Sequence, residues 1–333
     1  MTRSNAEKRS AFRAFDKEGC FVLPNPWDIG SARLFQHLGF SALATTSTGY
    51  AWTMGHPDYK VTRDAVLEHL TMICKATELP MNADFESGFA VDPEGVADNV
   101  KLAIKTGVAG LSIEDREISS PFGLYDTELC VERIKAARKA IDESGEDVVL
   151  VGRTEGLLSD LSAINPAIDK LVALADAGAD CLYAPGVGMT GKKEDIAAMV
   201  KAVAPKPVNV LVRGPGISFA ELRDLGVRRV SVGGALALVG WGAVRTAALE
   251  LKDGKFERLA DAAQSGEMND VFSSSTSVAH GCLVMGQPAE SLYARHGFLN
   301  LLRLCAEETS TLTFPRRTKP IPSRAPGPRP IED

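Results

Sequence analysis

Five carboxylates in the sequence follow short apolar runs, at the positions where the chain would leave a buried strand. They are Asp84, Glu86, Glu114, Asp115 and Glu155. Carboxylates that meet at one place repel one another unless a cation neutralises them. Because these are hard oxygen ligands with no thiolate or imidazole nearby, they favour Mg²⁺ or, as an alternative, Mn²⁺. The competing interpretation is a group of rim carboxylates that pair with Arg116 and Arg153.

These residues need a scaffold that brings separate strand ends together. Eight short apolar runs, mostly bounded by Gly, Pro or Asp, are typical of buried strands. They cover residues 20–24, 41–45, 80–85, 110–113, 148–152, 180–184, 207–212 and 227–232, with helical patterns at 62–77, 92–106, 127–144 and 166–177. Eight strands that alternate with helices predict an α/β fold, the closed (β/α)8 TIM barrel. The first run is not followed by G-x-G-x-x-G, which argues against a dinucleotide-binding fold.

In a barrel of this class, the chemistry lies at the carboxyl ends of the strands and in the loops after them. This rule selects the five carboxylates and three further features of the sequence. The first is a tight loop of hydroxyl residues at 45–49, the second is Arg153, and the third is Asn209 on the seventh run. The sequence therefore predicts that these groups share one polar rim.

The length of 333 residues fits one barrel with additions better than two domains. We assign residues 1–252 to the barrel with an N-terminal helix and 253–314 to a C-terminal helical extension. Within and beyond the barrel, helices are expected at 235–251, 255–264 and 285–308. Residues 315–333 hold six of the 18 Pro and five of the basic residues, and are predicted to form a flexible tail.

Charge and composition exclude several classes of function. The chain carries −6, of which the tail contributes +3, so the remainder carries −9 and is a poor partner for nucleic acid. The apolar, uncharged stretch 230–244 is too short and too rich in Gly to cross a membrane, and residues 1–15 lack the apolar core of a secretory signal. Six widely spaced Cys argue against a disulfide framework or a zinc site and favour a cytoplasmic location.

Four segments together resemble the isocitrate lyase/phosphoenolpyruvate mutase superfamily. NADFESGFA at 82–90 is similar to its D-x-D-x-G-[FY]-G metal-binding segment, and GLSIEDRE at 110–117 to its G-x-x-I-E-D-Q strand. Residues 25–51 resemble its N-P-x-D-x-x-S-A opening, and VGRTEG at 151–156 resembles its A-R-T-[DE] motif. Each segment alone is a weak signal, but the four occur in the family's order.

The resemblance implies a set of site residues. Mg²⁺ would be held, partly through water, by Asp84, Glu86 and Glu114, and Asp58 matches an active-site aspartate of the family. The remaining matches concern the substrate. Its carboxylate would bind the hydroxyl and amide groups of Thr46, Ser47, Thr48 and Gly49. Arg153 would hold the substrate by its charge, and Asn209 would make a further polar contact. The family also exchanges its eighth barrel helix between subunits, which implies a homodimer or homotetramer.

The departures from the family pattern restrict the activity. Isocitrate and methylisocitrate lyases carry K-[KR]-C-G-H after the fourth strand, whereas residues 119–125 here contain neither Cys nor His. The acid/base residue therefore stays open, and for Tyr50, Tyr125 and His56 we favour packing or exposure over catalysis. Cys130, the nearest cysteine, is expected in the core of a helix.

The function expected from the residues and the resemblance is a Mg²⁺-dependent lyase. It would cleave a C–C bond of a small 2-oxo or 2-hydroxy di-acid through an enolate, as a carboxylate-substrate lyase or a decarboxylase. One alternative is a mutase or hydrolase of phosphonate C–P bonds, such as a phosphonopyruvate hydrolase. The other is a non-catalytic ligand-binding barrel, against which the retained carboxylates and Arg153 argue.

Overall fold

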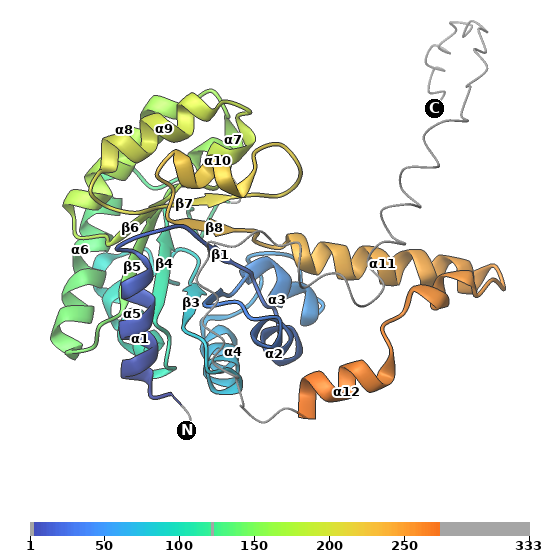
Figure 1. The fold of residues 1–333 in the computed structure, drawn as a ribbon. Helices are drawn as coiled ribbons and strands as arrows, with labels where there is room; N and C mark the ends of the chain where they lie inside the picture. The colour runs from blue at the N-terminus through green and yellow to red at the C-terminus, as the bar shows by residue number, and fades with distance from the viewer. Residues whose placement is uncertain (1–2, 121–122, 274–333) are drawn as a thin grey trace, which may run out of the picture. The chain divides into compact units, whose positions relative to one another are not determined.

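The computed structural model describes residues 3–120 and 123–273 (Figure 1). The contacts divide the chain into Met1–Val278 and Ala279–Asp333. Only the first unit contains described residues, so the expected helix at 285–308 and the tail at 315–333 lie outside them.

The eight predicted strands are present and form one parallel sheet. They are β1 (Phe21–Leu23), β2 (Leu43–Ala44), β3 (Met81–Asp84), β4 (Gly110–Glu114), β5 (Val149–Arg153), β6 (Cys181–Tyr183), β7 (Val208–Leu211) and β8 (Arg229–Ser231). The order β1-β8-β7-β6-β5-β4-β3-β2 is that of a barrel opened at one seam. The amide of Ala44 donates to the carbonyl of Pro24 across this seam at 3.2 Å. The prediction of a (β/α)8 barrel is confirmed.

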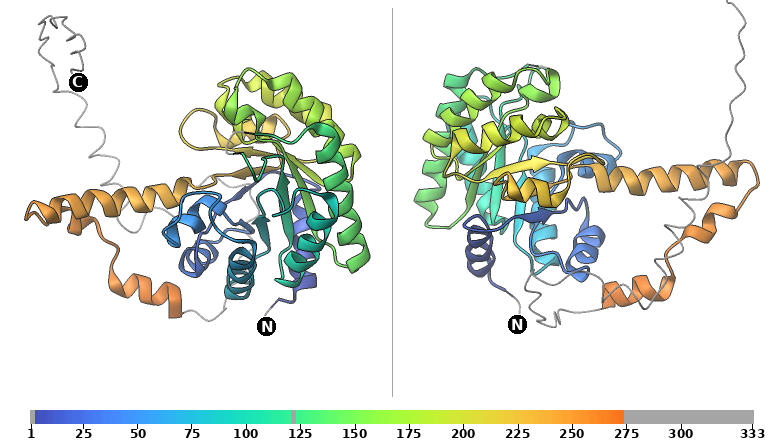
Figure 2. Two further views of the ribbon diagram at one scale, coloured as in Figure 1. Left: turned by 180° about the vertical axis from the view of Figure 1, so that it is seen from behind. Right: turned by 45° about the horizontal axis from the view of Figure 1, so that its top comes forward.

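Helices surround the strands in the alternation that the sequence predicted (Figure 2). They are α1 (Asn5–Phe15), α2 (Ile29–His37), α3 (Ser47–Thr53), α4 (Arg63–Ala76), α5 (Pro93–Lys105), α6 (Thr127–Ser144), α7 (Gly156–Ser159), α8 (Ile164–Asp176), α9 (Lys193–Val203) and α10 (Phe219–Asp224), with the 3-10 helix η1 (Pro185–Met189). On α4, Val66, Leu70 and Ile73 face the core and are at most 5% exposed. Burying each such side chain stabilises the fold by roughly 1.5–3 kcal/mol.

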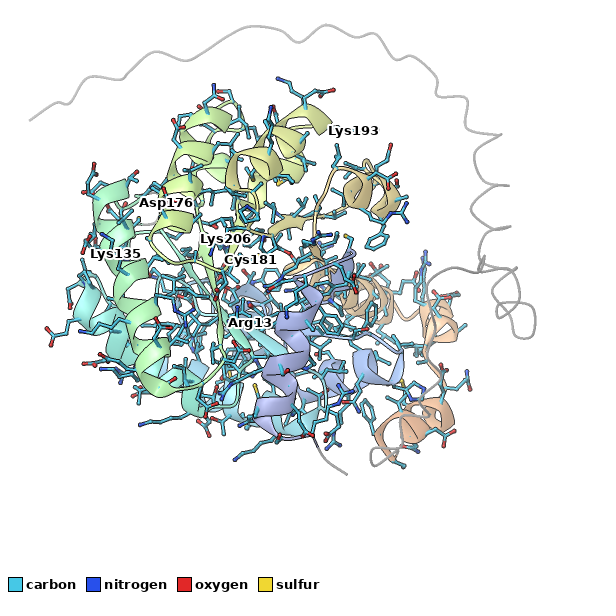
Figure 3. The ribbon with its side chains drawn as sticks, turned by 60° about the vertical axis from the view of Figure 1, so that its left-hand side comes forward. Arg13, Lys135, Asp176, Cys181, Lys193 and Lys206 are labelled. Carbon is cyan, nitrogen blue, oxygen red and sulfur yellow. The ribbon has the colours of Figure 1, made fainter. Side chains whose placement is uncertain are left out.

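Charged residues mark the outer faces and the base of the barrel. Lys135, Asp176 and Lys193 lie on the exposed sides of α6, α8 and α9 (Figure 3). Arg13 of α1 forms an ion pair with Asp180, immediately before β6, at 3.3 Å. This pair ties the N-terminal helix to the strands, as expected for a helix that belongs to the barrel.

Two local predictions were wrong. The stretch at 45–49 is not a loop throughout, because Thr46 caps the N-terminus of α3, with its side chain accepting from the amide of Gly49. Hydroxyl residues favour this capping position, so the run of threonines and serine starts a helix. The helix expected at 255–264 is only the short 3-10 helix η2 (Glu257–Asp261), and a helix not predicted, α12 (Ser265–Ser273), follows it and contacts α2.

The helix after β8, α11 (Ala235–Lys252), is apolar but hardly buried. Among its residues only Ala237 is buried, whereas Val239 is 69% and Val244 60% exposed. The helix runs away from the strands instead of covering them (Figure 2). Within the described residues, no helix combines the length and apolarity needed to span a bilayer.

His69 of α4 is a buried titratable group between two helices. Its ring stacks on Tyr50 of α3, with centroids 3.8 Å apart and planes 13° apart. Its Nε2 is buried without a hydrogen-bond partner in the described part of the chain. Burial lowers the pKa of His69 to about 4, with the charge of Asp28 opposing this shift.

We predict that His69 makes the fold sensitive to mild acid. The unfolded chain takes up a proton near the ordinary pKa of about 6.5, whereas the folded chain does so only near 4. Stability is therefore complete above pH 6.5 and is lost between pH 6.5 and 4, by roughly 3 kcal/mol in total. His69→Phe keeps the stacked ring and removes this loss, which urea unfolding at a series of pH values measures.

The exposed His37→Gln serves as the matched control and should keep the pH dependence of the native protein. An unchanged slope in His69→Phe would show that other groups cause the acid sensitivity.

Candidate active site

A cavity of about 370 Å³ lies among the carboxyl ends of the strands and the loops after them. Of the site residues predicted from the sequence, seven line it: Thr46, Ser47, Thr48, Asp58, Asp84, Arg153 and Asn209. Gly49, Glu86 and Glu114 do not line it and lie behind the wall. The structure therefore brings most of the predicted groups to one place.

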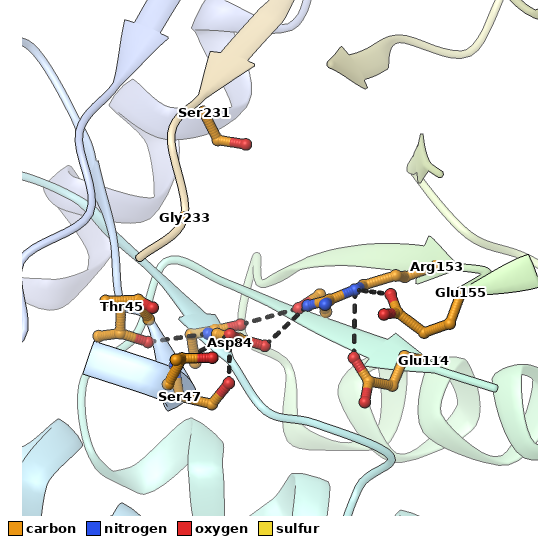
Figure 4. Close-up of polar contacts among 12 residues, drawn as sticks. Thr45, Ser47, Asp84, Glu114, Arg153, Glu155, Ser231 and Gly233 are labelled. Carbon is orange, nitrogen blue, oxygen red and sulfur yellow. Dashed lines mark hydrogen bonds and ion pairs between the residues drawn. The ribbon is translucent and has the colours of Figure 1, made fainter. Parts of the chain in front are cut away.

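Arg153, at the end of β5, lies at the centre of the carboxylates (Figure 4). Its Nη1 donates to Asp84 Oδ1 at 3.0 Å, and its Nε lies 3.1 Å from Glu114 Oε2 and 2.5 Å from Glu155 Oε1. Strand pairing sets part of this geometry, because Glu114 and Arg153 are register partners on β4 and β5. Burial works to lower the pKa of Arg153, but the three carboxylates hold it well above its ordinary value. The guanidinium therefore stays charged.

Asp84, at the end of β3, is held from two further sides (Figure 4). Its Oδ2 accepts from the amide of Ser47 at 3.0 Å and from the Ser47 hydroxyl at 2.8 Å. Its own amide donates to the hydroxyl of Thr45 at 2.8 Å. The amide of Ser47 belongs to the N-terminus of α3, where the helix dipole favours a negative charge. Asp84 is thus a fixed carboxylate on the wall of the cavity.

Asp58 lies beside this pair, in the segment between α3 and α4. It accepts from the hydroxyl of Thr48 at 2.6 Å. Burial raises the pKa of Asp58, and the negative charge of Asp84 acts in the same direction. The two predicted residues Thr48 and Asp58 therefore form a unit on the wall of the cavity.

Glu86 and Glu114 are buried next to these groups. Burial, reinforced by the charges of Asp84 and Asp58, raises the pKa of Glu86 to about 8. Burial also holds the pKa of Glu114 well above its ordinary value, although Arg153 and the hydroxyl of Tyr59 oppose this. Glu86 has a φ of 47° and Tyr59 a φ of 60°, a region that residues other than Gly rarely adopt. The local backbone is strained to place these two side chains.

Asp115 is not part of this group, contrary to the sequence prediction of a shared rim. It accepts from the Thr154 hydroxyl at 2.7 Å and from the Glu155 amide at 2.8 Å, and it forms an ion pair with Lys170 at 2.8 Å. Neighbouring residues of a strand point to opposite faces, which separates Asp115 from Glu114. Asp115 joins β4 to the turn after β5 and to α8.

The residues can be tested for their fit to a divalent cation. The described ranges contain no group of three or more His, Cys, Asp or Glu side chains placed to hold a metal ion directly. However, Mg²⁺ usually keeps several waters and binds proteins through one or two carboxylates. Asp84 reaches the cavity, and Glu114 Oε1 is buried without a hydrogen-bond partner in the described structure. The donors fit a hydrated Mg²⁺ that Asp84 would hold, with Glu86 and Glu114 as further carboxylates behind it.

Several cavity residues were missed or misjudged from the sequence. Tyr50 and Tyr125 are buried in the core, as favoured, whereas Tyr59 and Tyr183 line the cavity. Arg213, in the segment after β7, also lines it. Arg213 could have been predicted, because it directly follows the seventh apolar run and the site of a barrel lies at the carboxyl ends of its strands. The sequence holds no comparable signal for Tyr59, which lies between two helices.

Other predictions from the sequence hold in the described structure. Cys130 is buried in α6, and its thiol donates to the carbonyl of Tyr125 at 3.6 Å. His56 is exposed. Asn209 donates to the hydroxyl of Ser231 at 2.9 Å and is oriented by it. Among the described residues, the cavity wall therefore contains neither the family's cysteine nor a histidine.

Comparisons with known proteins agree with this geometry. A family model described as phosphoenolpyruvate phosphomutase matches residues 12–252. A lyase- or mutase-like structure from Burkholderia cenocepacia J2315 superimposes with a TM-score of 0.78 and 42% identity, covering 81% of this chain and 98% of the other. Oxaloacetate acetylhydrolase, solved with its product oxalate, has a TM-score of 0.71 and 27% identity, covering 81% and 94%. An oxaloacetate decarboxylase of Pseudomonas paraeruginosa is 31% identical over 247 residues, 70% of this chain and 81% of that protein.

We predict that Asp115 contributes more to the stability of the fold than Asp84 does. Asp115→Asn leaves Lys170, whose side chain is only 13% exposed, without its counter-charge, so the free energy of unfolding should fall by about 3 kcal/mol. Asp84→Asn removes one of several carboxylates that repel each other, and should change it by less than about 1 kcal/mol. Urea unfolding at neutral pH measures both.

Adding Lys170→Met to Asp115→Asn should restore part of the lost stability, because the two residues act as a pair. If Asp84→Asn and Asp115→Asn lower the free energy of unfolding equally, the prediction that Asp115 contributes more to stability is wrong.

Proposed function

The chain belongs to the phosphoenolpyruvate phosphomutase family of the isocitrate lyase/phosphoenolpyruvate mutase superfamily, and from this we propose that it is a Mg²⁺-dependent carbon–carbon lyase. This superfamily consists of lyases and mutases that act on small carboxylates, and the chain is an enzyme of this class. We propose a small 2-oxo or 2-hydroxy di-acid as substrate. The observation that carries the proposal is the convergence of Asp84, Glu114 and Glu155 on Arg153 beside a cavity lined by hydroxyl groups.

In this proposal, Mg²⁺ is held by Asp84, with Glu86 and Glu114 as supporting carboxylates. When bound, the cation supplies positive charge at the place where an enolate develops after a neighbouring bond breaks. The chain's own contribution is to keep Asp84 oriented through Ser47 and Arg153. The hydroxyls of Thr46 and Thr48 and the amide of Asn209 are proposed to orient the substrate carboxylate.

Arg153 is proposed to act through one edge of its guanidinium. Its hydrogen bonds and ion pairs with described residues use Nε and Nη1. Nη2 is therefore left for a substrate oxygen. A fixed positive charge next to a developing oxyanion stabilises the transition state without any reorganisation. Asp58 is proposed to orient a water molecule near this edge through its contact with Thr48.

The missing lyase cysteine favours one kind of C–C cleavage. A lyase that releases a second organic acid needs a positioned acid to protonate it, whereas a decarboxylation releases CO₂ and leaves an enolate that water can protonate. The cavity offers no thiol or imidazole among its described lining residues. We therefore favour decarboxylation of an oxaloacetate-like substrate within the proposed class.

We further propose that the enzyme is a homodimer or homotetramer that operates in the cytoplasm. The exposed apolar residues of α11, including Val239, Trp241 and Val244, support contact with another copy of the chain. The four described cysteines are free thiols, which agrees with a reducing compartment.

The purified protein is predicted to release pyruvate from oxaloacetate, and to need Mg²⁺ for it. The test compares oxaloacetate, 2-methylisocitrate and phosphonopyruvate with added Mg²⁺ and with a chelator, and measures pyruvate and inorganic phosphate. Asp84→Asn should lower kcat/KM by about 1,000-fold, because it removes charge at the reacting centre. The exposed Asp160→Asn is the matched control and should remain active.

Phosphate release from phosphonopyruvate would instead establish C–P cleavage. If Mg²⁺ with oxalate fails to raise the melting temperature of the protein, the proposed metal-and-enolate site is wrong.

A single charge on α11 is predicted to break the assembly. Val244→Asp places a carboxylate on the apolar surface, so light scattering should show monomers where the native protein is a dimer or tetramer. Thr246→Asp, on the same helix, has its hydroxyl bonded within the helix at the Gly242 carbonyl and serves as the control. A native protein that is already monomeric would contradict the proposed assembly.

A further inference from the structure

Arginines supply all the positive charge on the described wall of the cavity. They are Arg116, Arg153, Arg213 and Arg229, without any Lys or His. Arg229 is committed to Asp16, which accepts from its Nε at 2.7 Å and from its Nη2, and its guanidinium lies 4.5 Å from the ring centre of Phe12. Arg153 is surrounded by three carboxylates. These two guanidiniums are neutralised by the protein itself.

The other two guanidiniums differ from each other in their surroundings. Arg116 lies over the ring of Tyr59, with its guanidinium carbon 4.6 Å from the ring centre, and its backbone pairs with Leu124. Arg213 is exposed, and no hydrogen bond or ion pair joins it to another described residue. Unlike Arg153 and Arg229, Arg213 therefore has no acidic partner among the described residues.

The topology places Arg213 across the cavity from Asp84. In an eight-stranded barrel with the order found here, β3 and β7 lie four strands apart, on opposite sides of the ring. Asp84 ends β3, and Arg213 lies two residues beyond the end of β7. Both residues line the same cavity, so a molecule held at Asp84 that extends across the mouth of the barrel would extend toward Arg213.

The segment that carries Arg213 leaves space for such a contact. Gly214 and Gly216 flank Pro215, and a Cβ at either glycine would meet nothing within 4 Å. Gly216 has a φ of 153°, which favours glycine. On its other side, Arg213 lines a second cavity of about 380 Å³, formed with residues at the start of α9. Arg213 thus lines two cavities.

We infer that Arg213 binds the second carboxylate of the substrate and makes the site selective for di-acids over mono-acids. The inference rests on the proposed function, since it concerns the substrate of that same site. A guanidinium forms paired, charge-assisted hydrogen bonds with a carboxylate, and the partner that this arginine lacks in the protein is an anion. Arg153 cannot serve both ends of a di-acid, because three carboxylates already surround it.

Calorimetric binding with Mg²⁺ present tests the inference with three probes. Oxalate has both of its carboxylates at the Asp84 end, 3,3-difluorooxaloacetate has a carboxylate at its far end as well, and 2-oxobutyrate is the mono-acid of similar length. Arg213→Gln should raise the Kd of difluorooxaloacetate by about 10- to 100-fold. It should leave the Kd of oxalate and of 2-oxobutyrate within about twofold, because neither presents an anion to this position.

Two further variants make the result specific. Arg213→Lys keeps the charge and should recover part of the affinity for difluorooxaloacetate. Arg223→Gln, an exposed arginine of α10 that pairs with Asp224, is the matched control and should bind all three probes as the native protein does.

The inference is overturned if Arg213→Gln leaves the affinity for difluorooxaloacetate unchanged, or weakens all three probes equally. It is also overturned if the native protein binds difluorooxaloacetate no more tightly than 2-oxobutyrate. Because binding is measured without turnover, the proposed function is decided separately. A protein that binds di-acids through Arg213 but cleaves none of them would contradict the lyase activity alone.

Discussion

The attraction between one guanidinium and the carboxylates around it holds the candidate site together. Arg153 is the only cation that contacts Asp84, Glu114 and Glu155 among the described residues, and Glu86 and Asp58 add further acidic groups nearby. Such a group carries more negative than positive charge, so it must bind protons or a cation. Burial is the main reason that the pKa values of Glu86, Glu114 and Asp58 are raised, and the neighbouring negative charges raise them further. The barrel can maintain this excess of negative charge because the strand ladder fixes the positions from which these side chains emerge.

Residues that are adjacent in sequence around Arg153 and its carboxylates have different structural roles. Glu114 faces Arg153, while Asp115 turns to Lys170 and connects β4 with α8. Ser47 combines a helix-terminal amide with a hydroxyl, and both donate to one oxygen of Asp84. Residues that are adjacent in sequence therefore differ in role. Glu114 belongs to the candidate site, whereas its neighbour Asp115 supports the fold, and Ser47 at the start of a helix orients Asp84.

The sequence was sufficient to predict the barrel, and seven of the predicted site residues line the cavity. The eight strands can be identified because each is short and apolar and most are bounded by Gly, Pro or Asp, and strand ends must meet in a barrel. The sequence could not reveal that Asp115 leaves the group, since this depends on which face of β4 each residue takes. Nor could it place Tyr59, whose position depends on how the segment between α3 and α4 folds over Glu114. Hydroxyls that cap a helix and hydroxyls of a loop look alike in sequence, which explains the error at 45–49.

The strained backbone around the site has a consequence for engineering. Among the described residues, positive φ outside glycine occurs at Tyr59, Glu86 and Phe89, all in the two segments beside Asp84. Such a conformation costs a non-glycine residue roughly 1–2 kcal/mol. Glycine at these positions would relieve the strain but remove the side chains that the strain holds in place. Efforts to make this enzyme more resistant to heat should therefore leave these two segments alone and begin elsewhere on the barrel.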